Sequence, residues 1–268
     1  MEAVRRPAVA GAFYPREAQA LKEQVEAYLD AARPGADSAL PKAIIAPHAG
    51  YIYSGPIAAS IYARLAPLRG RVRRVVLAGP AHRVYVAGAA IPTARAFASP
   101  LGDVTLDAET LAALRALPFV EESDRAHALE HSLEVHLPFL QAVLGGFTLV
   151  PIVVGDASAE EVARLFEAAW GGDEALVVVS SDLSHYLPYE AARARDRNTV
   201  EAILRLEPRL DPEEACGAAP INGLLQVARR RGLRPELVDL RNSGDTAGDK
   251  DRVVGYAAFA FRQEGARA

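Results

Sequence analysis

The chain has a single cysteine, Cys216, among 268 residues, so no internal disulfide can form. It also lacks any apolar run near the roughly 18 residues that a membrane-spanning helix needs, and no signal-like apolar core follows Met1. A formal net charge of -4 gives no general attraction for nucleic acid or for an anionic membrane. We therefore expect a cytoplasmic protein that binds neither nucleic acid nor membrane.

Sequence motifs of several common enzyme classes are missing as well. There is no Walker phosphate loop and no dinucleotide-binding glycine fingerprint, which removes the usual signals of nucleotide chemistry. The segment Ser180-Ser-Asp-Leu-Ser-His185 contains the residue types of a serine triad, but the strained Gly-x-Ser-x-Gly turn is absent. Three such side chains so close in sequence rarely converge, so a serine hydrolase is disfavoured.

Apolar runs of strand length alternate with stretches of helical period, which is typical of a mostly parallel sheet covered by helices. Prolines between positions 79 and 106 favour short β pieces there. The predicted strands are 42–46, 73–78, 147–154, 175–180, 235–241 and 253–261, the last two as an antiparallel hairpin, and the predicted helices are 16–32, 55–66, 107–117, 132–144, 158–170, 188–206, 211–216 and 221–231. Because no internal repeat or linker is present, we predict that residues 1–268 form a single α/β domain with a central mixed, mostly parallel sheet flanked by helices.

Three of the six histidines follow predicted strands. His48 and His82 come just after apolar runs, and His185 follows another. Because the carboxyl ends of parallel strands share one edge of an open α/β sheet, where ligands bind, we predict a site at this edge. His185 suits proton transfer there, since an unperturbed imidazole has a pKa of about 6.5. The alternatives are that His48 caps the next helix and that His185 is a surface residue.

The remaining histidines and the cysteine give weaker signals. His131 and His136 are five residues apart, so they lack the i, i+4 spacing of a zinc-binding helix. His136 flanks a leucine stripe and is interpreted as structural, whereas His131 at the start of the predicted helix is a candidate for lining the site. His127 has no supporting pattern. Spacing alone favours Cys216 as a small buried apolar residue, although a thiolate beside two imidazoles could bind copper, zinc or iron.

A set of motifs occurs in order from near the amino terminus to the last predicted strand. They are Pro7-Ala-Val-Ala-Gly-Ala-Phe-Tyr-Pro15, Ala46-Pro-His-Ala-Gly-Tyr-Ile-Tyr-Ser-Gly55, Gly79-Pro-Ala-His82, Glu130-His-Ser-Leu-Glu134, Leu137-Pro-Phe-Leu140, Ser180-Ser-Asp-Leu-Ser-His185, Cys216-Gly and Gly255-Tyr256. Together they resemble the Memo family, named for mediator of ErbB2-driven cell motility. Its prokaryotic members are often labelled AmmeMemoRadiSam system protein B, and the resemblance covers essentially the whole chain.

The resemblance implies a fold similar to class III extradiol ring-cleaving dioxygenases, which hold non-haem Fe(II) with two histidines and one carboxylate. By resemblance, His48 and His82 take the two histidine-ligand positions and Cys216 takes the carboxylate position. The acid/base histidine of those enzymes corresponds to His185, and Asp182 joins the predicted pocket as a second catalytic candidate. Because a thiolate replaces a hard carboxylate, we expect iron or copper, with zinc as a third candidate, and we do not carry over dioxygenase activity.

The resemblance also implies a ligand pocket. The animal Memo protein is regarded as a phosphotyrosine-peptide binder, and its aromatic wall is matched here by Phe13, where the animal branch has tryptophan, and by Tyr53. With His131, these residues are predicted to contact a small-molecule or peptide ligand. The favoured function is a metal-dependent oxidoreductase of unknown substrate. The alternatives are a non-catalytic module for an aromatic or phosphorylated ligand, and a partner of a radical S-adenosylmethionine enzyme and an AMMECR-like protein.

Overall fold

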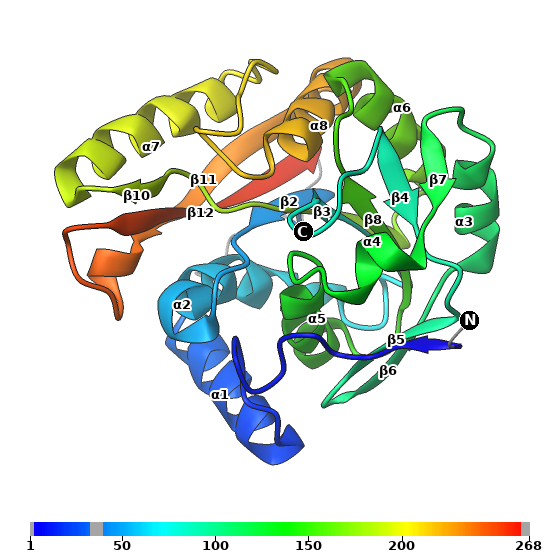
Figure 1. Ribbon diagram of the computed structural model, residues 1–268, viewed down its shortest axis with the longest axis horizontal. Coiled ribbons are helices and arrows are strands. Elements are labelled where there is room, and N and C mark those ends of the chain that lie inside the picture. The colour runs from blue at the N-terminus through cyan, green and yellow to red at the C-terminus, as the bar shows by residue number, and fades with distance from the viewer. Residues whose placement is uncertain (1–2, 33–39, 264–268) are drawn as a thin grey trace.

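A nine-stranded mixed sheet runs through the computed structural model, which describes residues 3–32 and 40–263 (Figure 1). The strand order is β10-β12-β2-β9-β3-β8-β4-β7, with β11 paired to β12. Its centre consists of four adjacent parallel strands, which are β2 (Ala43–Ala46), β9 (Ala175–Ser180), β3 (Arg74–Pro80) and β8 (Thr148–Val154). These strands are almost entirely buried, as expected for strands covered on both faces. The predicted α/β fold with a mixed sheet is confirmed.

Antiparallel strands extend this parallel centre on both sides. The long strand β12 (Val253–Gln263) pairs with β11 (Leu233–Asn242) along one edge, which confirms the predicted hairpin. Its other edge pairs with β10 (His185–Leu187) near its start and with β2 near its end. On the far side, β4 (Ala89–Ile91) lies antiparallel to β8 and parallel to β7 (Val120–Glu122). The four parallel strands therefore lie inside the sheet, away from its edges.

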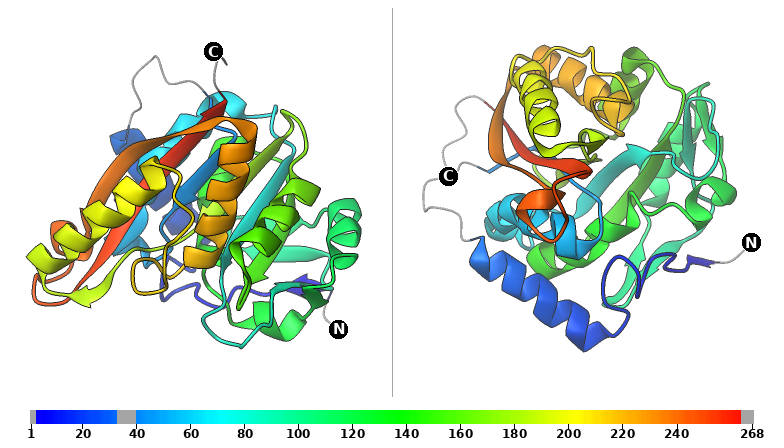
Figure 2. Two further views of the ribbon diagram at one scale, coloured as in Figure 1. Left: turned by 90° about the horizontal axis from the view of Figure 1, so that it is seen from above. Right: turned by 60° about the vertical axis from the view of Figure 1, so that its left-hand side comes forward.

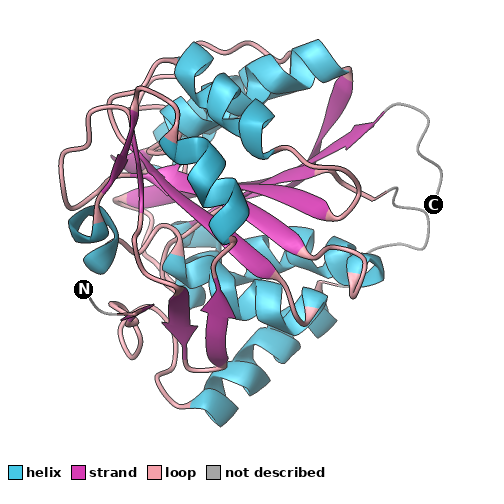
Figure 3. Cartoon of the chain, turned by 90° about the vertical axis from the view of Figure 1, so that its right-hand side faces the viewer, coloured by secondary structure: helices cyan, strands magenta, loops and turns pink. Residues whose placement is uncertain are grey.

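Helices cover both faces of the sheet, as Figure 1 shows and as Figures 2 and 3 show from other sides. One layer contains α1 (Ala18–Ala31), α2 (Tyr51–Tyr62) and α5 (Leu137–Leu144), and the other contains α3 (Ala108–Arg115), α6 (Ala159–Ala169), α7 (Tyr189–Leu204) and α8 (Ala218–Arg231). Helices α6 and α8 pack closely, because a Cβ on Gly223 of α8 would lie 2.4 Å from Val162 Cγ1. Among the described residues, no helix has the length and apolar character to cross a bilayer.

Short β pieces between positions 79 and 106 were predicted and are present. Strands β5 (Ala96–Ser99) and β6 (Gly102–Thr105) form a hairpin, and β1 (Val4–Arg5) joins it to make a second, three-stranded sheet. This small sheet attaches the amino-terminal segment to the body of the molecule. The short helix α4 (Asp124–Ala128) follows β7.

Two predicted helix boundaries are wrong for local reasons. Helix α2 begins at Tyr51 and not at residue 55, because Gly50 acts as its N-cap and Gly55 packs inside the helix against the Tyr28 ring. The predicted helix 132–144 is divided into a turn, a 3₁₀ segment η2 (Glu134–His136) and α5. Pro138 lies in the first turn of α5, where a missing N–H costs little.

The predicted helix at 211–216 is absent, and the chain forms turns there. The Asp211 carboxylate accepts hydrogen bonds from the backbone N–H groups of Glu213, at 2.8 Å, and Glu214, at 3.0 Å. An aspartate that binds the backbone two and three residues ahead stabilises a turn in competition with a helix. This turn brings the chain back to the sheet just before Cys216.

Candidate metal centre

His48 lies at the carboxyl end of β2, two residues beyond its last residue, Ala46. The side chain is 2% exposed. Its backbone N–H donates to Asp182 Oδ1 at 2.8 Å, and its Nδ1 lies 2.6 Å from Ser180 Oγ. Ser180 is the last residue of β9, the strand next to β2, so adjacent strand ends hold the imidazole from two directions.

His82 lies at the carboxyl end of β3 and is held by Glu130. The backbone N–H of His82 donates to Glu130 Oε2 at 2.6 Å, and His82 Nδ1 lies 2.9 Å from Glu130 Oε1. Burial alone would raise the pKa of Glu130, but the hydrogen bond and charge of His82 and the N–H of Ser132 hold it at about 2. A carboxylate can only accept, so Nδ1 of His82 carries a proton, and in the neutral ring the lone pair is therefore on Nε2.

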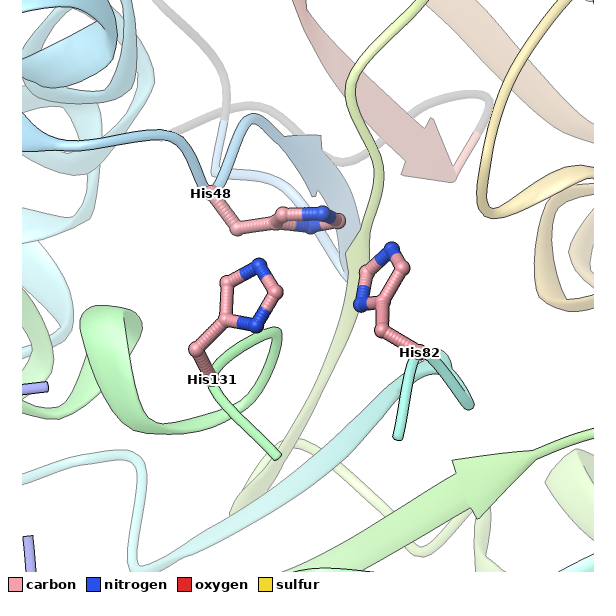
Figure 4. A group of neighbouring side chains, drawn as sticks. All are labelled: His48, His82 and His131. Atoms are coloured by element: carbon pink, nitrogen blue, oxygen red, sulfur yellow. The ribbon is translucent and has the colours of Figure 1, made fainter. Parts of the chain in front are cut away.

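His131 completes a cluster of three imidazoles, called here the three-histidine cluster, which Figure 4 shows converging from three segments of the chain. One donor atom from each of His48, His82 and His131 lies within 4.8 Å of the others. The ring centroids of His82 and His131 are 4.7 Å apart, and His48 lies 5.1 Å from His82 and 5.5 Å from His131. Such a cluster could hold a metal ion.

The protonation state of the cluster fits a metal site. Burial, followed by the charges of neighbouring histidines, lowers the pKa of His48 well below its ordinary value. Burial also lowers the pKa of His131 to about 4, despite the nearby charge of Glu130. Both rings are therefore neutral at physiological pH, and a neutral imidazole nitrogen is the form that binds a metal.

Cys216 contacts this cluster from the segment before α8. Its Sγ lies 3.4 Å from His48 Nε2 and accepts a hydrogen bond from the Asp182 N–H at 3.3 Å. Burial, and then the charge of Asp182, raise the pKa of the thiol to about 12. A cation bound beside the sulfur would lower that pKa, because the thiolate is the ligand form.

The sequence predicted Cys216 as the third metal ligand and His131 as a ligand-binding residue. Within the described part of the chain, the group of mutually close donor atoms consists of the three histidines, and the Cys216 sulfur lies 3.4 Å from one of them, His48. His131 thus offers a nitrogen donor at a position where the sequence predicted a wall of the pocket. The assignment of Cys216 as a ligand stays a prediction.

The two predicted proton-transfer residues lie beside the cluster. Asp182 is buried, and burial raises its pKa to about 7 although the His48 N–H and the charge of His82 oppose that shift. His185 lies in β10, partly buried, and burial lowers its pKa, with the charge of His82 contributing. Their catalytic roles stay predictions.

Phe13 and Tyr53, the residues of the predicted aromatic wall, both lie near the start of α2. The Phe13 ring meets the His131 ring edge-on, with centroids 4.9 Å apart, and the backbone carbonyl of Phe13 accepts the first N–H of α2 from Tyr51 at 2.8 Å. Tyr53 lies in the first turn of α2 and is partly buried. A cavity of about 460 Å³ opens beside His82 and Cys216, lined by residues 80–86, 154–156 and part of 212–220. A ligand in this cavity would border both candidate donors.

Sequence analysis missed Glu130, the residue that orients His82. Its only sequence signal is its position next to His131 in Glu130-His-Ser-Leu-Glu134, because it lies 48 residues from the histidine it contacts. Carboxylates commonly orient metal-binding histidines in this way.

Comparison with known proteins gives consistent results. A family model described as Memo-like protein matches residues 5–260. Proteins described as MEMO1 family protein match from Sulfolobus acidocaldarius at 34% identity, over 96% of this chain and 99% of that one, and from Ignicoccus hospitalis at 39%, over 96% and 98%. An uncharacterized Escherichia coli K12 protein of known structure matches with a TM-score of 0.51 at 15% identity, over 81% of this chain and 98% of that chain, which shows a shared fold alone.

Proposed function

The chain belongs to the Memo family, and on that basis we propose that the three-histidine cluster binds a transition-metal ion that serves a redox reaction. The observation that carries the proposal is the approach of three imidazoles to within 4.8 Å, with the Cys216 sulfur 3.4 Å from His48 Nε2. Imidazole and thiolate donors suit copper, iron and zinc better than magnesium or calcium. Iron or copper is our proposal for the resident ion, because zinc has no redox chemistry.

When bound, such an ion supplies electron transfer to or from a substrate. The chain's own residues would bind that substrate in the 460 Å³ cavity beside His82 and Cys216 and would move its protons. Asp182 suits proton exchange because its pKa of about 7 lies near neutral pH. His185 is the second proposed proton carrier, since it is neutral at that pH and can accept a proton.

A non-catalytic binding role is the alternative, and the aromatic contact of Phe13 with His131 favours it. An aromatic ligand bound there without turnover would distinguish this role from an oxidoreductase. Association with radical S-adenosylmethionine and AMMECR-like proteins stays a prediction that co-purification would test. A cytoplasmic location likewise stays a prediction.

Metal analysis of untagged protein tests the proposed function. We expect about one equivalent of iron or copper in the wild type and its loss in the His48→Ala, His82→Ala double variant, because two of the close donors are removed. Cys216→Ser and His131→Ala, measured separately, identify the third donor. His185→Gln is the matched histidine control and should keep its metal. Equal metal content in the wild type and the double variant would contradict the proposal.

A further inference from the structure

A buried chain of hydrogen bonds begins at the backbone of Ser132 and reaches His48. Ser180 Oγ donates to the Ser132 carbonyl oxygen at 2.6 Å. The same Oγ lies 2.6 Å from His48 Nδ1 and 2.8 Å from His136 Nε2, and His136 Nδ1 lies 2.8 Å from the Tyr62 hydroxyl. All of these residues are at most 2% exposed, so water does not compete for their hydrogen bonds.

The backbone carbonyl of Ser132 determines which atom donates in each of these hydrogen bonds. A carbonyl oxygen can only accept, so the single hydroxyl proton of Ser180 goes to Ser132. Ser180 Oγ then has only lone pairs for the two imidazoles. Both ring nitrogens must donate to it, which gives His48 a proton on Nδ1 and His136 a proton on Nε2.

The far end of the chain agrees with this order. With its proton on Nε2, a neutral His136 has a bare Nδ1 that can only accept, and the Tyr62 hydroxyl is a donor. Burial keeps both groups neutral, since it lowers the pKa of His136 to about 3 and raises the pKa of Tyr62. Each donor in this row of hydrogen bonds thereby faces an acceptor.

The packing around Ser180 leaves room for this contact only because residue 79 has no side chain. A Cβ on Gly79 of β3 would lie 2.9 Å from Ser132 Oγ and 3.1 Å from Ser180 Cβ. Any other residue there would push the two serines, whose separation defines the first bond of the chain. Gly79 is therefore needed for the packing around these hydrogen bonds and not for a turn.

We propose that Ser180, with His136 behind it, is a positioning residue that locks His48 in the Nδ1-protonated tautomer. The Nε2 lone pair of His48 is then always directed toward Cys216 Sγ, 3.4 Å away. Figure 4 shows the His48 ring beside those of His82 and His131. His82 reaches the same tautomer through the Glu130 carboxylate. The Nδ1–H of His48 donates to a neutral hydroxyl, whereas that of His82 donates to a carboxylate. The anionic partner makes His82 the more electron-rich metal ligand.

The inference about metal affinity rests on the proposed function, but the tautomer can be measured on metal-free protein. Two-bond ¹H–¹⁵N correlation spectra of ¹⁵N-histidine-labelled protein distinguish an Nδ1–H ring from an Nε2–H ring. We expect His48 as Nδ1–H in the wild type and in Ser180→Thr, which keeps the hydroxyl. In Ser180→Ala, where the acceptor is gone, we expect a mixture with Nε2–H. Finding Nε2–H in the wild type, or an unchanged ring in Ser180→Ala, would overturn the inference.

Zn(II) titrated against a chromophoric chelator provides the second readout. Loss of an outer partner of a ligating histidine typically costs about 10- to 100-fold in metal affinity, so we expect that loss in Ser180→Ala and wild-type affinity in Ser180→Thr. If Ser180→Ala does not fold, Ser180→Cys keeps the volume with a poorer acceptor and replaces it in both measurements. A wild type that binds no Zn(II) but keeps a fixed His48 tautomer would contradict the affinity prediction and leave the tautomer inference supported, whereas the proposed function is tested by the metal analysis above.

Discussion

Burial holds most of the described histidines neutral at physiological pH. The pKa values of His48, His127, His131 and His136 are all lowered, with burial as the largest cause in each case. Neutral imidazoles are competent metal ligands, but the same burial makes the fold sensitive to acid. Below about pH 6.5 these histidines bind protons in the unfolded chain but not in the folded one. The free energy of unfolding therefore falls as the pH decreases.

His127 allows this effect to be measured away from the candidate metal centre. Its folded pKa is about 4, so its contribution to stability is present above about pH 6.5 and declines as the pH falls toward 4. Between pH 7 and pH 5 we expect the wild type to lose about 2 kcal/mol more than His127→Gln, whose amide can still donate to the Ala90 carbonyl. Urea unfolding at both pH values measures the difference. Equal losses in the two proteins would contradict the assignment.

The sequence predicted those site residues that follow strands, because the strand signal is local. His48 and His82 were expected at one sheet edge, and they lie 5.1 Å apart by ring centroid. The residues that orient them carry no local signal, since Ser180 lies 132 residues from His48 and Glu130 lies 48 residues from His82. His136 was predicted to be structural because it flanks a stripe of leucines. That pattern indicates a helix with a buried face, but it carries no information about the contact of the His136 ring with Ser180.

Among the secondary-structure elements, long apolar or strongly periodic segments were predictable and boundaries were less so. The buried parallel strands and helix α6, which begins with a Ser158–Glu161 capping box, match the predictions closely. The start of α2 and the turn at 211–216 did not match. The start of α2 depends on the close approach of Gly55 to the Tyr28 ring, and the turn depends on the hydrogen bonds of the Asp211 side chain. Periodicity does not report such contacts.

The contact between α6 and α8 predicts the effect of a single methyl group. Gly223→Ala would gain roughly 1 kcal/mol of helix propensity, but its Cβ would lie 2.4 Å from Val162 Cγ1 and 3.0 Å from the Val162 backbone carbon. Overpacking of this kind costs about 1–3 kcal/mol, so after the gain in propensity we expect net destabilisation of up to about 2 kcal/mol by urea unfolding. Gly146→Ala, where a Cβ meets no atom within 4 Å, is the matched control. Gly223→Ala as stable as the wild type would refute the prediction.

At the scale of the whole molecule, one buried carboxylate attaches the amino-terminal segment to the site. Glu134 pairs with the Arg5 guanidinium and accepts from the N–H groups of Ala8, at 2.7 Å, and Val9, at 2.9 Å, and from the Tyr14 hydroxyl at 2.6 Å. These contacts hold the segment that carries Phe13 against His131. Residues 5–14 thus lie against the candidate site.

Replacing Glu134 should release this segment. In Glu134→Gln the buried Arg5 charge loses its counterion, which typically costs about 3–5 kcal/mol. We expect a lower unfolding free energy together with faster cleavage between residues 5 and 14 in limited proteolysis. Glu121→Gln, on the exposed face of β7, is the control and should behave as the wild type does. Proteolysis at the wild-type rate in Glu134→Gln would show that other contacts hold the segment.

The position of β12 in the sheet constrains biosynthesis. Strands β2, β9 and β3, which carry His48, Ser180 and His82 at or near their ends, leave the ribosome before β12, yet β12 supplies the neighbour of β2 and joins β10 and β11 to the sheet. Until β12 emerges, β2 has an unpaired edge that can associate with other nascent chains. The histidines of the candidate metal centre are thus translated before the strand that completes the sheet beside them. The complete sheet that carries the candidate metal centre can therefore form only once β12 has emerged and paired with β2.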